Sequence, residues 1–179
     1  MTMIPADTKD WTWVLERPCS ECGFDPKSYN RSGFSGAIAS NAAQWSKELS
    51  KPQVGIRESP HRWSTLEYGC HVRDVYEIFN ERLELMLSQT KPTFANWDQD
   101  KAAIDGRYGD SDPDAVVFDL GVSANKLARR IETLEVSDWE REGLRSNGSL
   151  FTVESIIRYL LHDVVHHIWD VTHNEKEII

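Results

Sequence analysis

The stretch RYLLHDVVHHIWDV, residues 158–171, decides the predicted fold of this chain. Its apolar residues recur with the spacing of a helix, and no glycine or proline interrupts them. At about 3.6 residues per turn, His162 and His166 lie one above the other on a single helix face. Zinc and similar divalent metals accept imidazole ligands, so the pair predicts a shared metal ion.

The best third ligand in the sequence is His71, which lies in the helical segment 64–87, STLEYGCHVRDVYEIFNERLELML. His71 shares its helix face with Val75 and Ile78, so this face is expected to point inward, where a histidine is costly unless it is hydrogen-bonded or metal-bound. We therefore predict a three-histidine site of His71, His162 and His166. His167 lies about 100° from His166 and is expected to face a neighbouring helix or solvent. A one-residue distortion of the helix would exchange these two, and each histidine taken alone is an ordinary core residue.

The rest of the chain predicts three more long helices around this one. The Ser64–Glu67 pair has the spacing of a capping box, and Asp112–Pro113 has the pattern of an N-cap followed by proline at the first helical position. Apart from an extended piece at 142–151, we expect no strands. The four helices are expected at 33–49, 64–90, 112–134 and 152–173, joined by a long polar connection at 91–111. The predicted fold is an all-α four-helix bundle with a long crossover, one domain over 1–179, with 1–32 as an N-terminal segment packed on the bundle.

Composition excludes several classes of protein. The net charge is −9 and the pI about 5.1, which argues against a nucleic-acid partner. The apolar runs are shorter than the roughly 20 residues that a membrane-spanning helix needs, and the first residues lack a signal-peptide pattern. We therefore expect a cytoplasmic protein with no nucleic-acid or membrane partner. The partners expected instead are a small-molecule substrate and, because related helical bundles often pair, a second copy of the chain in a homodimer.

The cysteines allow a second interpretation. Cys19 and Cys22 form a CxxC pattern, typical of redox motifs or of half a zinc site, and Cys70 is expected to be a core residue. A mixed site of both thiolates with His162 and His166 is one alternative. We favour ordinary thiols in a packed N-terminal segment, and so predict that Cys19 and Cys22 do not bind the main metal.

Three stretches carry a resemblance to a known family: WTWVLERPCSECGFD at 11–25, RWSTLEYGCHVRDVY at 62–76 and REGLRSNGSLFTVESIIRYLLHDVVHHIWDV at 141–171. The chain resembles the DinB/YfiT-like superfamily of metal-binding four-helix proteins, and in particular its actinobacterial members related to mycothiol-dependent enzymes. The resemblance implies that one histidine of the second helix and two of the fourth bind a divalent metal, which by position correspond to His71, His162 and His166.

Three neutral imidazoles leave an open position on a divalent ion, where a bound water or thiol becomes a nucleophile. With the resemblance, this predicts a thiol-dependent S-transferase or isomerase that uses zinc or nickel and mycothiol or another low-molecular-weight thiol. Arg145, Arg158 and Tyr159 are the candidates for holding that thiol, and no catalytic acid or base is assigned. The alternatives are a metal-dependent hydrolase and a non-catalytic metal- or ligand-binding protein of the same fold.

Overall fold

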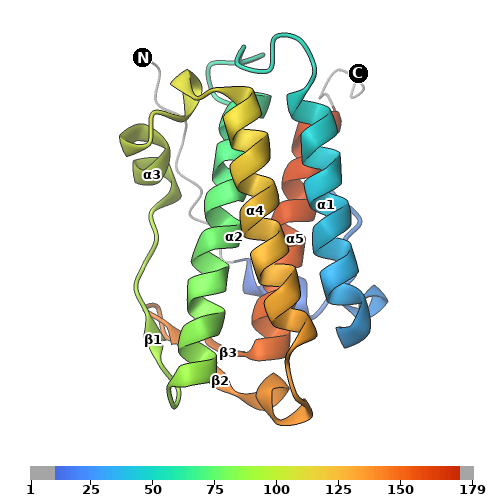
Figure 1. The fold of residues 1–179 in the computed structure, drawn as a ribbon, viewed down its shortest axis with the longest axis vertical. Coiled ribbons are helices and arrows are strands. Elements are labelled where there is room, and N and C mark those ends of the chain that lie inside the picture. Colours follow the sequence, from blue (N-terminus) through green and yellow to red (C-terminus); the bar gives the residue numbers. More distant parts are fainter. Residues whose placement is uncertain (1–10, 174–179) are drawn as a thin grey trace.

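The computed structural model describes residues 11–173, and they form a bundle of four long helices (Figure 1). The long helices are α1 (Phe34–Leu49), α2 (Thr65–Ser88), α4 (Pro113–Glu132) and α5 (Val153–Thr172). The shorter elements are η1 (Thr12–Leu15), η2 (Pro26–Ser28), η3 (Arg31–Gly33), β1 (Thr93–Phe94), α3 (Gln99–Asp105), η4 (Tyr108–Asp110), η5 (Val136–Glu140), β2 (Glu142–Arg145) and β3 (Leu150–Thr152). The predicted all-α bundle is confirmed.

The predicted helix starts are also confirmed. Ser64 and Glu67 make a reciprocal capping box at α2, and Asp112 caps α4 with Pro113 at its first position. Each cap satisfies backbone N–H groups that have no partner inside the helix. The start of α2 is thereby fixed about two turns before His71.

A buried polar contact holds three of the long helices together near the centre of the bundle. The side-chain amide of Asn41 on α1 donates to the carbonyl of Val164 on α5, at 2.8 Å. The hydroxyl of Tyr76 on α2 donates to the Asn41 amide oxygen, also at 2.8 Å. Because both bonds are buried and fully formed, they fix α5 against α2 beside the histidines.

A small sheet closes the lower end of the bundle in Figure 1. β1 pairs in parallel with β2, and β2 pairs antiparallel with β3. The extended piece expected at 142–151 is a hairpin. The polar connection at 91–111 contains the strand β1, which we did not expect, and the short helix α3. No helix within residues 11–173 has both the length and the apolar character needed to cross a membrane.

Gly143 in β2 gives a direct test of how this sheet packs. A Cβ at this position would lie 2.3 Å from Phe94 Cζ and 3.0 Å from Met86 Cγ. We expect Gly143→Ala to lower the free energy of unfolding by about 1–3 kcal/mol, the usual cost of overpacking a core. Chemical denaturation measures this effect. The matched control is Gly121→Ala in α4, where a Cβ meets nothing within 4 Å and should stabilise the helix by about 0.5–1 kcal/mol. Equal stability of the two variants would contradict the packing.

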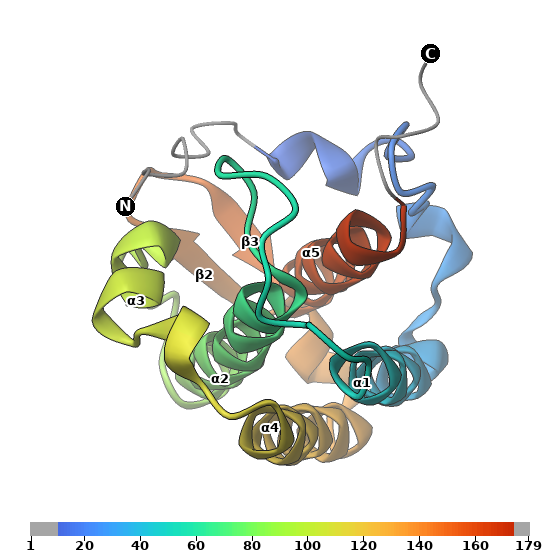
Figure 2. The same cartoon turned by 90° about the horizontal axis from the view of Figure 1, so that it is seen from above.

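The N-terminal segment, taken here as residues 11–33, runs along the outer side of α5 (Figure 2). Arg158 on α5 donates to the carbonyls of Pro26 and Tyr29, and Arg31 donates to Glu154 at 2.7 Å. These bonds tie the segment to the first turns of α5. The segment is thus positioned to bring its cysteines to the later turns of the same helix.

Candidate metal centres

The helix α5 carries two pairs of residues that can bind a metal, and the second pair is shifted by one position along the helix. His162 and His166 form one pair, and Asp163 and His167 form the other. Each pair has the four-residue spacing that places two side chains on one face, and the two faces differ by about 100°. The structure places a different partner segment against each face. Two separate groups of metal-binding side chains result.

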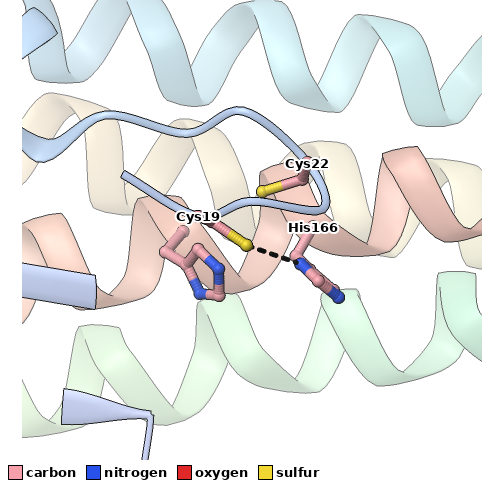
Figure 3. A group of neighbouring side chains, drawn as sticks. Cys19, Cys22 and His166 are labelled. Carbon is pink, nitrogen blue, oxygen red and sulfur yellow. Dashed lines mark hydrogen bonds between the residues drawn. The ribbon is translucent and has the colours of Figure 1, made fainter. Parts of the chain in front are cut away.

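The first, called here the cysteine group, consists of Cys19, Cys22, His162 and His166. Each residue contributes a ligand atom, and these atoms lie within 4.8 Å of one another. Cys19 Sγ lies 3.7 Å from His166 Nδ1, and Figure 3 shows both thiols and the His166 ring pointing toward one another. Cys19, His162 and His166 are buried, and Cys22 is half-buried.

The turn that carries the two cysteines is closed by its own backbone. Gly23 N–H donates to the Cys19 carbonyl at 3.0 Å, and Cys19 N–H donates to the Phe24 carbonyl at 2.8 Å. Gly23 has φ of +72°, a conformation that glycine adopts without the steric cost other residues meet. The C-x-x-C-G sequence thus folds into a tight turn that presents both thiols to α5.

The second, called here the His71 group, consists of His71, Asp163 and His167. Asp163 Oδ1 lies 3.5 Å from His71 Nε2 and 3.6 Å from His167 Nε2. Two ligands of a tetrahedral zinc ion, each about 2.0–2.1 Å from the metal, are about 3.4 Å apart. One ion therefore fits the distances from the carboxylate to both imidazoles.

Orphaned polar atoms support the fit of a metal to both groups. His71 Nδ1 and Nε2, Asp163 Oδ1 and His162 Nε2 are buried and have no hydrogen-bond partner within residues 11–173. Such atoms are rare in folded proteins and call for an explanation. A metal ion at the centre of each group would be the missing partner of those atoms that face it.

Other residues hold and shield the His71 group. Asp170 Oδ2 lies 2.8 Å from His167 Nδ1, the nitrogen on the far side of the ring from Asp163. A carboxylate that accepts from the second nitrogen of a ligand histidine fixes its tautomer and orientation. The ring of Trp97 stacks on His71 at 5.3 Å, and Trp63 lies at the same distance in a tilted arrangement. The connection at 91–111 therefore contributes to this site through Trp97.

The protonation states of the three buried histidines and of Asp163 suit metal binding. Burial lowers the pKa of His162 to about 4, with a smaller contribution from the neighbouring His166. Burial also lowers the pKa of His71 and of His166, so these three imidazoles are neutral at neutral pH. Burial disfavours the ionised form of Asp163, but the His71 and His167 rings outweigh this and hold its pKa at about 2. The Cys22 thiol differs, because burial raises its pKa to about 12, and a metal ion that bound it would have to displace its proton.

The structure divides the three predicted ligands between the two groups. His162 and His166 are together, as expected, but their neighbours are Cys19 and Cys22, and His71 belongs with Asp163 and His167. The reason is that the N-terminal segment lies against the 162/166 face of α5, whereas α2 lies against the 163/167 face. His71 is fully buried, as its position on the inward face predicted. Ligation itself remains a prediction for all of these residues.

The residues predicted to hold a thiol cofactor are placed in two different environments. Arg145 Nη1 lies 3.4 Å from the Tyr159 hydroxyl, which is on α5 one turn before Asp163. Arg158, in contrast, is engaged by Glu154 and by the carbonyls of Pro26 and Tyr29. Arg158 thus holds the N-terminal segment, and its predicted ligand-binding role finds no support in these contacts.

Sequence reasoning missed one candidate ligand, Asp163, and one half-buried cation, Arg82. Asp163 was overlooked because it stands among histidines, although Asp163-x-x-x-His167 has the same spacing as His162-x-x-x-His166. Arg82 was overlooked because the sequence shows only that it is on the same helix face as His71. Its guanidinium lies over the rings of Phe79 and Phe94, and within residues 11–173 it makes no hydrogen bond or ion pair. Burial, with help from the nearby Arg145, lowers the pKa of Arg82 to about 10.

Comparison with known proteins agrees with this architecture. The DinB superfamily profile matches residues 38–171, which is most of the chain. This chain belongs to the DinB superfamily. Among solved structures, YfiT from Bacillus subtilis, described as a probable metal-dependent hydrolase with an unusual four-helix bundle topology, superposes with a TM-score of 0.70. The match covers 79% of this chain and 85% of YfiT at 15% identity, so it shows that the two proteins share a fold. Comparison with curated protein sequences gives no match.

Proposed function

We propose that this DinB superfamily protein is a metal-dependent enzyme whose reaction takes place at the His71 group. The observation that supports this most directly is the convergence of two imidazole nitrogens on one carboxylate oxygen, at 3.5 and 3.6 Å, in a site where His71 is buried and Asp163 and His167 are half-buried. Three protein ligands of this kind leave a coordination position for a reactant, as in catalytic zinc sites built from two histidines and a carboxylate. Zinc and nickel both accept this donor set.

A divalent ion in such a site lowers the pKa of a coordinated water or thiol and polarises a carbonyl group. The residues of the chain have separate tasks. Asp163 offsets one of the two positive charges, and Asp170 keeps the His167 ring turned so that its Nε2 faces the centre. Trp97 and Trp63 cover His71 and exclude bulk water from that side.

Hydrolysis is the reaction that this donor set supports best. The description of YfiT as a probable metal-dependent hydrolase points the same way, although its low identity carries only the fold. No acid or base outside the group is assigned. The reaction proposed is therefore hydrolysis of an ester or amide, in which water adds to the carbonyl carbon, the C–O or C–N bond breaks, and the alcohol or amine leaves with a proton from the water.

Thiol transfer is the second candidate, and the arginine pair favours it. Arg145 lies over the ring of Tyr159, with its Nη1 3.4 Å from the hydroxyl, and Tyr159 is on α5 one turn before Asp163. Burial, with a smaller contribution from the charge of Arg145, lowers the pKa of Arg82 to about 10. Such a cluster would hold the carboxylate or hydroxyl groups of a low-molecular-weight thiol of the mycothiol type. The S-transferase or isomerase reaction expected from the family resemblance belongs to this candidate.

The test compares two assays on one sample. Chelator-stripped protein is reloaded with Zn²⁺ or Ni²⁺ and given simple esters and amides, then an electrophile with and without a low-molecular-weight thiol. Metal-dependent turnover without thiol supports the hydrolase, and turnover that requires thiol supports the transferase. Asp163→Asn, which keeps the shape of the side chain but loses its charge, should lower either rate at least about 100-fold.

An unchanged rate in Asp163→Asn would contradict a reaction at the His71 group. Absence of both activities in the metal-loaded protein would favour the non-catalytic, ligand-binding alternative. Arg82→Gln separates the two reactions further. It should weaken thiol-dependent turnover at low thiol concentration and leave the hydrolysis of an uncharged ester unaffected.

A further inference from the structure

We infer that the cysteine group is a second metal site, a closed four-ligand zinc site that fastens the N-terminal segment to α5. It is separate from the reaction proposed above and does not depend on it. The four residues are Cys19, Cys22, His162 and His166, whose ligand atoms lie within 4.8 Å of one another.

The geometry of the group suits zinc. In a tetrahedral site with Zn–S of about 2.3 Å and Zn–N of about 2.0–2.1 Å, sulfur and nitrogen ligands are about 3.6 Å apart. The distance between Cys19 Sγ and His166 Nδ1 is 3.7 Å. The spacing C-x2-C followed by H-x3-H is also that of structural Cys2His2 zinc sites. Distances and spacing are independent observations, and they agree.

Charge and neighbouring groups support the same ion. Two thiolates and two neutral imidazoles balance the charge of a divalent ion, which suits a buried position. His166 Nε2, on the side away from Cys19, lies 3.5 Å from a carboxylate oxygen of Glu21 and 4.0 Å from one of Asp170. Carboxylates near the second nitrogen are usual for ligand histidines. His162 Nε2 is buried without a partner within residues 11–173.

Four protein ligands leave no coordination position for a reactant, so we infer a structural role for this site. The His71 group, with three ligands, leaves one position open. The cysteine group joins the N-terminal segment to the last helix, because its cysteines come from the turn at 19–23 and its histidines from α5. The rings of Trp11 and Phe24 also pack on His162, at 5.4 and 5.6 Å. A metal here would hold this whole segment in place.

Cobalt substitution of the full chain tests the inference without any variant. Co²⁺ bound to thiolates gives a sulfur-to-metal charge-transfer absorption in the near ultraviolet, which nitrogen and oxygen ligands do not give. We expect the intensity of this band at saturation to correspond to one thiolate-bound Co²⁺ per chain, with up to one further equivalent bound at the His71 group, and the band to disappear when zinc displaces the cobalt. Cobalt binding without the band, or a Cys19–Cys22 disulfide in protein purified under reducing conditions, would overturn the inference.

Variants then distinguish the two sites. Cys19→Ser/Cys22→Ser should lose the band and one zinc per chain. Asp163→Asn, the matched control in the other group, should keep the band in full. Because the double variant could fold poorly, Cys22→His serves as a ligand-preserving substitution and should retain one zinc with a weaker band. A band that survives in the double variant would overturn the inference, whatever the activity assays show.

Discussion

Replacing His167 with alanine is expected to remove the ion of the His71 group and at least about a thousandfold of any metal-dependent turnover, because a metal contributes several kcal/mol to transition-state stabilisation. His167 Nε2 lies 3.6 Å from Asp163 Oδ1, and its ring contacts His71 edge-on at 4.7 Å. Its loss leaves two ligands for an ion that needs three. The α-helical circular dichroism should be unchanged, since the bundle is held by its apolar core.

The measurement is metal content and turnover in His167→Ala and His166→Ala, compared side by side. His166→Ala should keep the ion of the His71 group and lose that of the cysteine group. An exposed histidine, His61, provides the control for the loss of any imidazole. If His167→Ala kept full turnover while His166→Ala lost it, the original assignment of His71, His162 and His166 as one site would be restored.

The second large effect is expected at Asp170, which does not belong to either group of ligands. Asp170→Ala should weaken metal binding at the His71 group by about 10–100-fold, the usual cost of losing a carboxylate behind a ligand histidine. The cause is the lost bond at 2.8 Å to His167 Nδ1, which leaves the ring free to turn. Asp170→Asn keeps an acceptor oxygen but loses the charge, so its metal affinity should lie between those of the unmodified protein and Asp170→Ala.

Competition with a chelator of known affinity measures the change at Asp170. The matched control is Asp74→Ala, because Asp74 also flanks His71 but contacts Tyr108 and Arg73 instead. An affinity that is unaltered in Asp170→Ala would mean that His167 is oriented by packing alone. A comparable loss in Asp74→Ala would mean that charge in general, and not this bond, is responsible.

The sequence predicted the bundle well because its signals are local. The caps at Ser64 and Asp112 and the apolar spacing of four helices depend only on residues within a few turns. The two-residue β1 escaped prediction because so short a strand has no periodicity, and its pairing with β2 joins residues about 50 apart in the chain.

The candidate site could be predicted only in part, because local sequence signals determine only some of its geometry. Helical geometry alone places His162 with His166 and turns His167 away by about 100°. It cannot state which neighbouring segment each face meets, since that depends on how distant parts of the chain pack. From the sequence we grouped His71 with His162 and His166, whereas in the structure the ligand atom of His71 lies with those of Asp163 and His167.

The position of the N-terminal segment has a consequence for the order of folding. Cys19 and His166 are separated by 147 residues, and the entropy of closing so long a loop opposes their contact until the rest is in place. The surface on which the segment docks exists only after α5 has joined the bundle. We therefore expect the segment to be the last part to assemble and, in the metal-free chain, the first to open. A tightly bound ion would reverse the order of opening, and the contact between the turn at 19–23 and α5 would then be the last to break.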